Sequence, residues 1–97
     1  MPINVGGVDF DYAEMEFGRN RGIRIWVERQ ANSDREYKLR PDPHDYRKYN
    51  KNKQPQFYLE VAQAIAREYI QGNRQWPPPG TTIYVPLLAD YFTLEDR

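Results

Sequence analysis

The sequence predicts an α+β domain: an antiparallel sheet of four to five short strands with one main amphipathic helix packed on one face. Three observations predict it. Residues 55–71 follow a helical repeat, residues 1–40 alternate between apolar and polar side chains, and a second alternating stretch follows the prolines at 77–79. A chain of 97 residues has the length of a single domain, so all of these elements are expected to share one core.

Residues 1–40 are predicted to form a β-meander. The sequence INVGGVDF places a glycine pair between two alternating runs, which is typical of a tight hairpin. Residues 23–30 form the clearest strand, with Ile25 and Val27 on one face and Trp26 on the other. Residues 36–40 alternate again. We expect three or four antiparallel strands here, with their apolar face covered by the helix.

Residues 41–54 are predicted to be a basic polar loop. Pro41 and Pro43 end the meander, because proline cannot donate to a strand ladder and disfavours the helical conformation in the residue before it. The letters HDYRKYNKNK that follow carry no apolar repeat.

The helix predicted at about 55–71 has an apolar arc that covers roughly half of its circumference. Such a wide arc fits the face of a sheet. Pro55 suits the first turn, and Gly72-Asn73 is a plausible stop, since both residues tolerate a left-handed conformation. The arc is formed by Phe57, Tyr58, Leu59, Val61, Ala62, Ile65, Ala66, Tyr69 and Ile70.

Residues 76–97 are predicted to contain a stiff proline-rich turn, a final strand and an apolar tail. WPPPG is extended and ends in a turn. Residues 81–86 are rich in β-branched side chains and form the expected final strand. Residues 87–92 are strongly apolar, so this tail must fold back on the core or dock on a partner.

Composition limits the chemistry that we expect. With no cysteine and one histidine, His44, the chain offers neither a Cys-ligated metal site nor a disulfide, and we expect no metal and no cofactor. Ser33 is the only serine and lies in no nucleophile motif, so we expect a protein that is not an enzyme. His44 as a general base beside Asp42 or Asp45 is the less favoured alternative, polar surface being the more common role of such a residue.

The start of the chain is rich in acidic residues. A carboxylate site for Mg²⁺ or Ca²⁺ could use Asp9, Asp11, Glu14 and Glu16, but alternation splits these residues between two faces, so a solvated strand face is preferred.

No apolar run approaches 18 residues, and we expect no contact with membranes. The expected location is the cytoplasm, or a virion if the protein is a phage component.

Residues 35–53 combine cations with tyrosines, which is the pattern of a single-strand nucleic-acid binder. The candidate contacts are Arg40, Arg47, Lys48 and Tyr49. Acids lie within the same stretch and the net charge of the chain is +0, which argues against a generic binder of polyanions. Nucleic-acid binding is therefore the alternative function.

The preferred function is a non-enzymatic structural or protein–protein interaction subunit of a larger assembly. Eight tyrosines are many for this length, and tyrosine is common at interfaces. The partner would be another protein or a second copy of the chain. The predicted contact residues are Trp26, Trp76, Tyr84, Tyr91 and Phe92.

The segment PPPGTTIYVP, residues 77–86, resembles the closing segment of LysM-like modules in phage tail and baseplate proteins, where a proline-glycine turn leads into a short last strand. The resemblance covers these ten residues and assigns a role to none of them. It implies a structural part of a virion, such as a phage tail or baseplate component.

Overall fold

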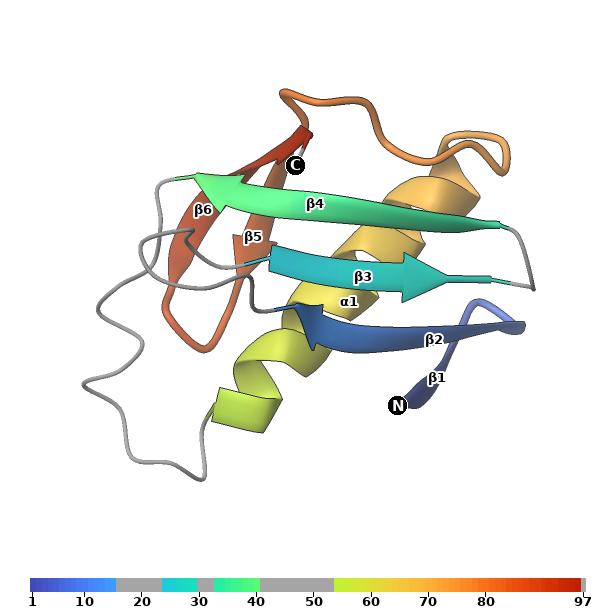
Figure 1. Ribbon diagram of the computed structural model, residues 1–97, viewed down its shortest axis with the longest axis horizontal. Helices are drawn as coiled ribbons and strands as arrows, with labels where there is room; N and C mark the ends of the chain where they lie inside the picture. The colour runs from blue at the N-terminus through green and yellow to red at the C-terminus, as the bar shows by residue number, and fades with distance from the viewer. Residues whose placement is uncertain (16–23, 30–32, 41–53, 97) are drawn as a thin grey trace.

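The computed structural model describes residues 1–15, 24–29, 33–40 and 54–96. In chain order its elements are β1 (Pro2–Val5), β2 (Val8–Met15), β3 (Arg24–Glu28), β4 (Asp34–Arg40), α1 (Gln54–Gln71), β5 (Thr82–Val85) and β6 (Asp90–Asp96). The strands form one antiparallel sheet in the order β1-β2-β3-β4-β6-β5, which curls into a half-barrel with α1 packed against it (Figure 1). The predicted α+β class is confirmed, and the sheet has six strands rather than four to five.

The meander predicted for residues 1–40 is present in the described part of that segment. β1 and β2 form a hairpin in which Val5 lies opposite Val8. Gly6 and Gly7, between them, have φ values of 60° and 82°. A two-residue turn with both residues at positive φ matches the twist of the flanking strands, which explains the glycine pair. β3 and β4 continue the antiparallel order.

Helix α1 ends where the sequence predicts. The N–H of Gly72 donates to the carbonyl oxygen of Glu68 at 2.8 Å, and the N–H of Arg74 donates to that of Tyr69 at 2.9 Å. The left-handed residues are Asn73 and Arg74, with φ values of 60° and 62°, rather than Gly72. These bonds satisfy carbonyl groups that the last helical turn leaves free.

The stretch predicted to be an apolar tail is instead a turn followed by a strand. Residues 86–89 form the turn, and β6 then runs between β4 and β5. Thr82–Val85 is therefore not the final strand but the edge strand, and the segment that resembles the end of a LysM-like module is followed by one more strand. The tail folds back because Phe92 and Leu94 alternate onto the inner face of the sheet, where both are buried.

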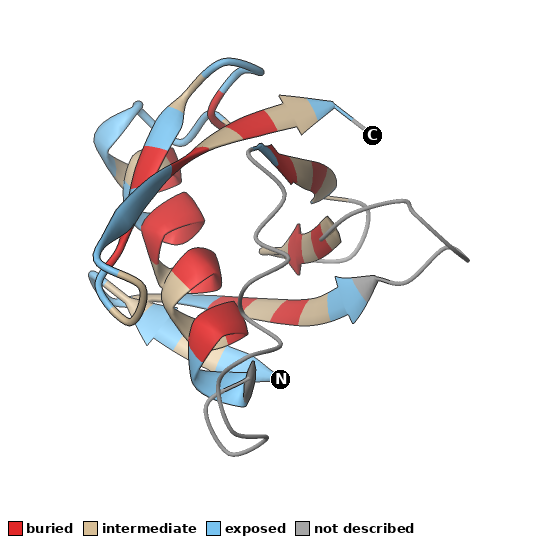
Figure 2. Ribbon diagram, turned by 90° about the vertical axis from the view of Figure 1, so that its left-hand side faces the viewer, coloured by how far each residue is buried: buried red, intermediate tan, exposed pale blue. Residues whose placement is uncertain are grey.

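The core lies between the inner face of the sheet and α1. Buried and less buried residues alternate along the strands, and the buried face of α1 looks into the curl (Figure 2). Ile25, Val27, Tyr37 and Leu39 on β3 and β4 have no exposed surface. The opposite, outer face of the sheet is free of α1, and its side chains are the ones that can meet a partner. We call it the outer face below.

Candidate interaction surface

Two exposed tyrosines lie side by side on the outer face of the β5–β6 hairpin. Tyr84 and Tyr91 are directly opposite each other in the strand register, with ring centroids 5.0 Å apart and ring planes at 57°. Their exposed fractions are 43% and 62%. Alternation explains the exposure, because their neighbours Ile83 and Phe92 point into the core. We call Tyr84 and Tyr91 the tyrosine pair.

The tyrosine pair lies beside a free sheet edge. The N–H of Leu94 donates to the carbonyl oxygen of Thr81 at 2.8 Å, and bonded and non-bonded residue pairs alternate along an antiparallel ladder. The main chain of Ile83 is therefore hydrogen-bonded to that of Phe92 on β6, whereas Thr82 and Tyr84 direct their N–H and C=O groups away from β6. In the described structure no strand lies beyond β5, so these groups face outward.

The far end of the hairpin is fastened to α1. The N–H of Leu87, in the turn, donates to Glu60 Oε1 at 2.7 Å, and Glu60 Oε2 accepts from Gln56 Nε2 at 3.0 Å. Within the turn, the N–H of Ala89 donates to the carbonyl oxygen of Pro86 at 3.0 Å. Leu87 is half-buried against the core. The hairpin therefore presents the tyrosine pair on a fixed support.

Trp26 is also on the outer face, but it lies on β3. Strand β4 separates it from the β5–β6 hairpin. The indole is half-buried, and its Nε1–H donates to Asp34 Oδ2 at 3.1 Å. Its cross-strand neighbours are Ala13 and Glu36. The structure thus leaves Trp26 on the predicted face with its polar group already bonded within the chain.

Two other predicted contact residues pack against the core, Phe92 fully buried and Trp76 in part. Phe92 is 3% exposed, and its ring centroid lies 6.0 Å from that of Phe57 on α1. Trp76 is half-buried, with centroids 4.5 Å from Tyr69 and 6.2 Å from Phe10. The prediction for Phe92 fails for a physical reason, namely that the segment is a strand with this residue on its inner face.

The predicted nucleic-acid contacts are only partly described. Arg40 lies exposed at the end of β4, where its Nη1 is 3.0 Å from Glu95 Oε1 on β6. Nearby on the outer face, Arg24 and Glu36 approach to 3.9 Å. Both of these arginines therefore lie beside an acid. Arg47, Lys48 and Tyr49, together with His44, lie outside the described residues.

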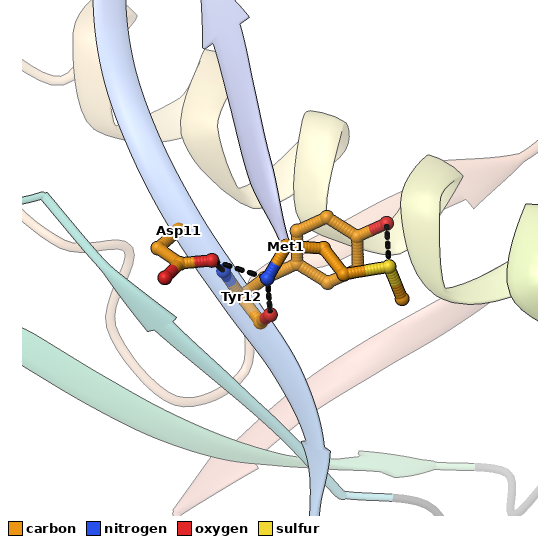
Figure 3. A network of polar contacts seen from close by, with 3 residues as sticks. All are labelled: Met1, Asp11 and Tyr12. Atoms are coloured by element: carbon orange, nitrogen blue, oxygen red, sulfur yellow. Dashed lines mark hydrogen bonds and ion pairs between the residues drawn. The ribbon is translucent and has the colours of Figure 1, made fainter.

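A row of carboxylates crosses the outer face at its other end. Asp11 lies opposite Glu28, and Glu28 lies opposite Asp34. Like charges in directly opposite positions are unfavourable. The ammonium group of Met1 reduces the repulsion within this row. It forms an ion pair and hydrogen bond with Asp11 and donates to the carbonyl oxygen of Tyr12 at 2.8 Å (Figure 3). That hydrogen bond is the main reason why the pKa of Asp11 is lowered.

Comparisons of the chain with protein-family models, with curated proteins and with solved structures found no match. Among the described residues, no three His, Cys, Asp or Glu side chains form a group that could hold a metal ion. In that same part of the chain, no helix has both the length and the apolar character needed to cross a membrane.

Sequence reasoning selected Tyr84 and Tyr91 separately but missed that they form a pair on an edge hairpin. The signal was present. Ile83 and Val85 before the turn, and Phe92 and Leu94 after it, alternate in the same way around the letters PLLA. Two alternating runs that flank a short turn indicate a hairpin, which would have placed both tyrosines on the same face.

Proposed function

We propose that this domain is a non-enzymatic structural or interaction subunit of a larger protein assembly, and that it docks through the tyrosine pair and the edge of β5. The observation that supports it best is the exposure of this pair. Met1, Tyr84 and Tyr91 are the large apolar side chains that are exposed among the described residues. The resemblance of residues 77–86 suggests a phage tail or baseplate as one setting.

The surface combines two means of recognition. Tyrosine rings contribute apolar contact area and a polar tip with few rotatable bonds, which is why they are frequent hot spots of protein interfaces. The outward N–H and C=O groups of Thr82 and Tyr84 offer main-chain hydrogen bonds to an extended partner segment. Because Glu60 holds the turn, little order has to be gained on docking.

Site-specific photo-crosslinking in cells that produce the protein tests the proposal. A photoreactive amino acid replaces Tyr91 in one variant and Asn4, exposed on β1, in the control. We expect a discrete protein adduct from position 91 and none from position 4, and we expect Tyr84→Ser to weaken the adduct without abolishing it, because the main-chain groups of β5 remain. Equal adducts from both positions, or none from position 91, would contradict the proposed surface.

Nucleic-acid binding is the second candidate, and one observation favours it. Arg40 lies opposite Thr93, and Tyr91 is two residues from Thr93 on the same face, so a cation and the tyrosine pair share the end of the sheet from which residues 41–53 leave. The anisotropy of labelled single-stranded and duplex oligonucleotides distinguishes the two functions. Binding that falls steeply with salt supports this candidate, since phosphate contacts release counterions, whereas no binding at low salt excludes it.

A further inference from the structure

We propose that the protein forms a two-fold homodimer in which β5 pairs antiparallel with β5 of a second copy, which joins two six-stranded sheets into one. This inference rests on the proposed docking role of the edge and names its occupant. It makes a specific claim about register. The two-fold axis passes between the Ile83 residues of the two copies, so Thr82 of each copy lies opposite Tyr84 of the other.

The hydrogen-bonding groups of β5 fit this register. Thr82 and Tyr84 both direct an N–H and a C=O outward, as derived above from the bond between Leu94 and Thr81. Opposing Thr82 to Tyr84 on both sides of the axis makes two bonded pairs, and each pair exchanges two hydrogen bonds. A register centred on Tyr84 would instead oppose Thr82 to Pro86, which has no N–H to donate.

The absence of charged residues from β5 also allows an identical strand to approach. A two-fold axis brings the same patch of both copies together, so a charged residue near the axis would lie close to an identical charge and be repelled by it. The strand has the sequence TIYV and is flanked by Gly80-Thr81 and Pro86, with no charged residue among them. Natural sheet edges usually carry lysine, proline or a bulge that prevents such pairing, and β5 contains no lysine and no proline.

The opposite edge of the sheet is protected in the usual way. The N–H of Tyr12 donates to the carbonyl oxygen of Met1, and the same alternation then makes Pro2 and Asn4 the outward residues of β1. Pro2 lacks an N–H, and the side chain of Asn4 donates to Asp9 Oδ1 at 2.8 Å. The two edges thus differ in how readily they accept another strand, and β5 is the edge that accepts one.

The mass in solution and a pair of engineered thiols test the dimer. The natural chain has no cysteine, so single thiols can be placed without background. Sedimentation equilibrium from ~1 μM to ~1 mM covers affinities down to weak contacts. We expect the mass to approach twice the monomer mass as concentration rises, and to be insensitive to salt. A monomer mass over the whole range would overturn the proposal.

The register is tested by mixing Thr82→Cys protein with Tyr84→Cys protein under mild oxidation. Both positions are exposed, so the fold should tolerate the changes. We expect disulfide-linked dimers in the mixture and few in either variant alone, and none with the control variant Asn4→Cys. Rapid linkage of the Tyr84→Cys variant to itself would overturn the register, and linkage of Asn4→Cys would overturn the choice of edge.

These outcomes are distinguishable from those of the photo-crosslinking experiment. A monomer in solution, together with a discrete adduct to a different protein from position 91, would overturn the dimer and leave the proposed docking function standing. A monomer that gives no adduct from that position would overturn both.

Discussion

The hydroxyl of Tyr37 on β4 donates a hydrogen bond of 2.5 Å to the carbonyl oxygen of Pro77, forty residues further along the chain. Tyr37 has no exposed surface, and Pro77 is buried as well. This contact fixes the proline-rich segment that leads from α1 to β5. A meander strand thereby helps to position the edge hairpin that carries the tyrosine pair.

Replacing Tyr37 with phenylalanine should lower the free energy of unfolding by ~1–3 kcal/mol, because a buried carbonyl group loses its donor. Urea denaturation measures the loss. The matched control is Tyr84→Phe, which removes a hydroxyl from an exposed ring and should change stability by less than ~0.5 kcal/mol. Equal losses in the two variants would show that the bond to Pro77 contributes nothing specific.

Stability should fall in alkaline solution because of the same residue. Burial raises the pKa of Tyr37 to about 12 from its ordinary value of 10.0. A pKa that is higher in the folded state gives a contribution that is complete below pH 10 and is lost as pH rises towards 12. Two pKa units correspond to ~2.7 kcal/mol, as an upper estimate. Unfolding measured from pH 9 to 12 should show this slope, and Tyr37→Phe should reduce it.

The hairpin glycines offer a matched pair of substitutions. Gly6→Ala and Gly7→Ala each force a side chain into the left-handed region, so each should cost ~1–2 kcal/mol of stability. The Cβ added at Gly6 would lie 3.2 Å from Ile70 Cδ1, and nothing lies within 4 Å of the one at Gly7. Because Cδ1 is the end of a flexible side chain, we expect similar losses in thermal unfolding. A much larger loss at Gly6 would mean that Ile70 cannot move aside.

The bond between Glu60 and the turn can be followed at a single amide. The N–H of Leu87 should exchange with solvent faster in Glu60→Ala than in the natural protein, because its acceptor is gone. Glu60→Gln keeps a carbonyl oxygen at the same place and should retain most of the protection. Hydrogen exchange followed by NMR decides between these outcomes. Unchanged exchange in Glu60→Ala would show that the turn is held by other contacts.

Acetylation of the N-terminus should raise the pKa of Asp11 towards its ordinary value, because it removes the ammonium group that lowers it. A carboxyl group whose pKa is lower in the folded state contributes stability above its unfolded pKa, and that contribution disappears as pH falls through the folded value. NMR titration of Asp11 in both forms provides the measurement. Both groups are exposed, so added salt should weaken the effect.

Elements with strong local signals were predictable from the sequence. The repeat from Phe57 to Ile70 defines α1 without tertiary information, and Gly6-Gly7 defines the first hairpin. β6 was missed because its alternation, Phe92 and Leu94 against Thr93, is short and follows directly on the apolar residues 87 and 88. A continuous apolar run does not show where a turn divides it.

The candidate surface was predictable only in part, since a residue type does not show whether a side chain is exposed. Tyr84, Tyr91 and Phe92 are all aromatic and near the end of the chain, and only their places on a strand separate the exposed pair from the buried phenylalanine. The free edge of β5 depends on strand order. That order is set by long-range pairing of β6 with β4, which no local pattern encodes.

The central place of β6 has a consequence for synthesis on the ribosome. The first four strands emerge early and can pair with one another in order, but β4 acquires its second neighbour only when residues 90–96 have been made. Until then the inner side chains of β4 lack Phe92 and Leu94 beside them, and a nascent chain that already contains α1 cannot complete its core. Of the described strands, the last to be translated is thus an interior strand of the sheet, and β5, made shortly before it, joins the sheet only through it.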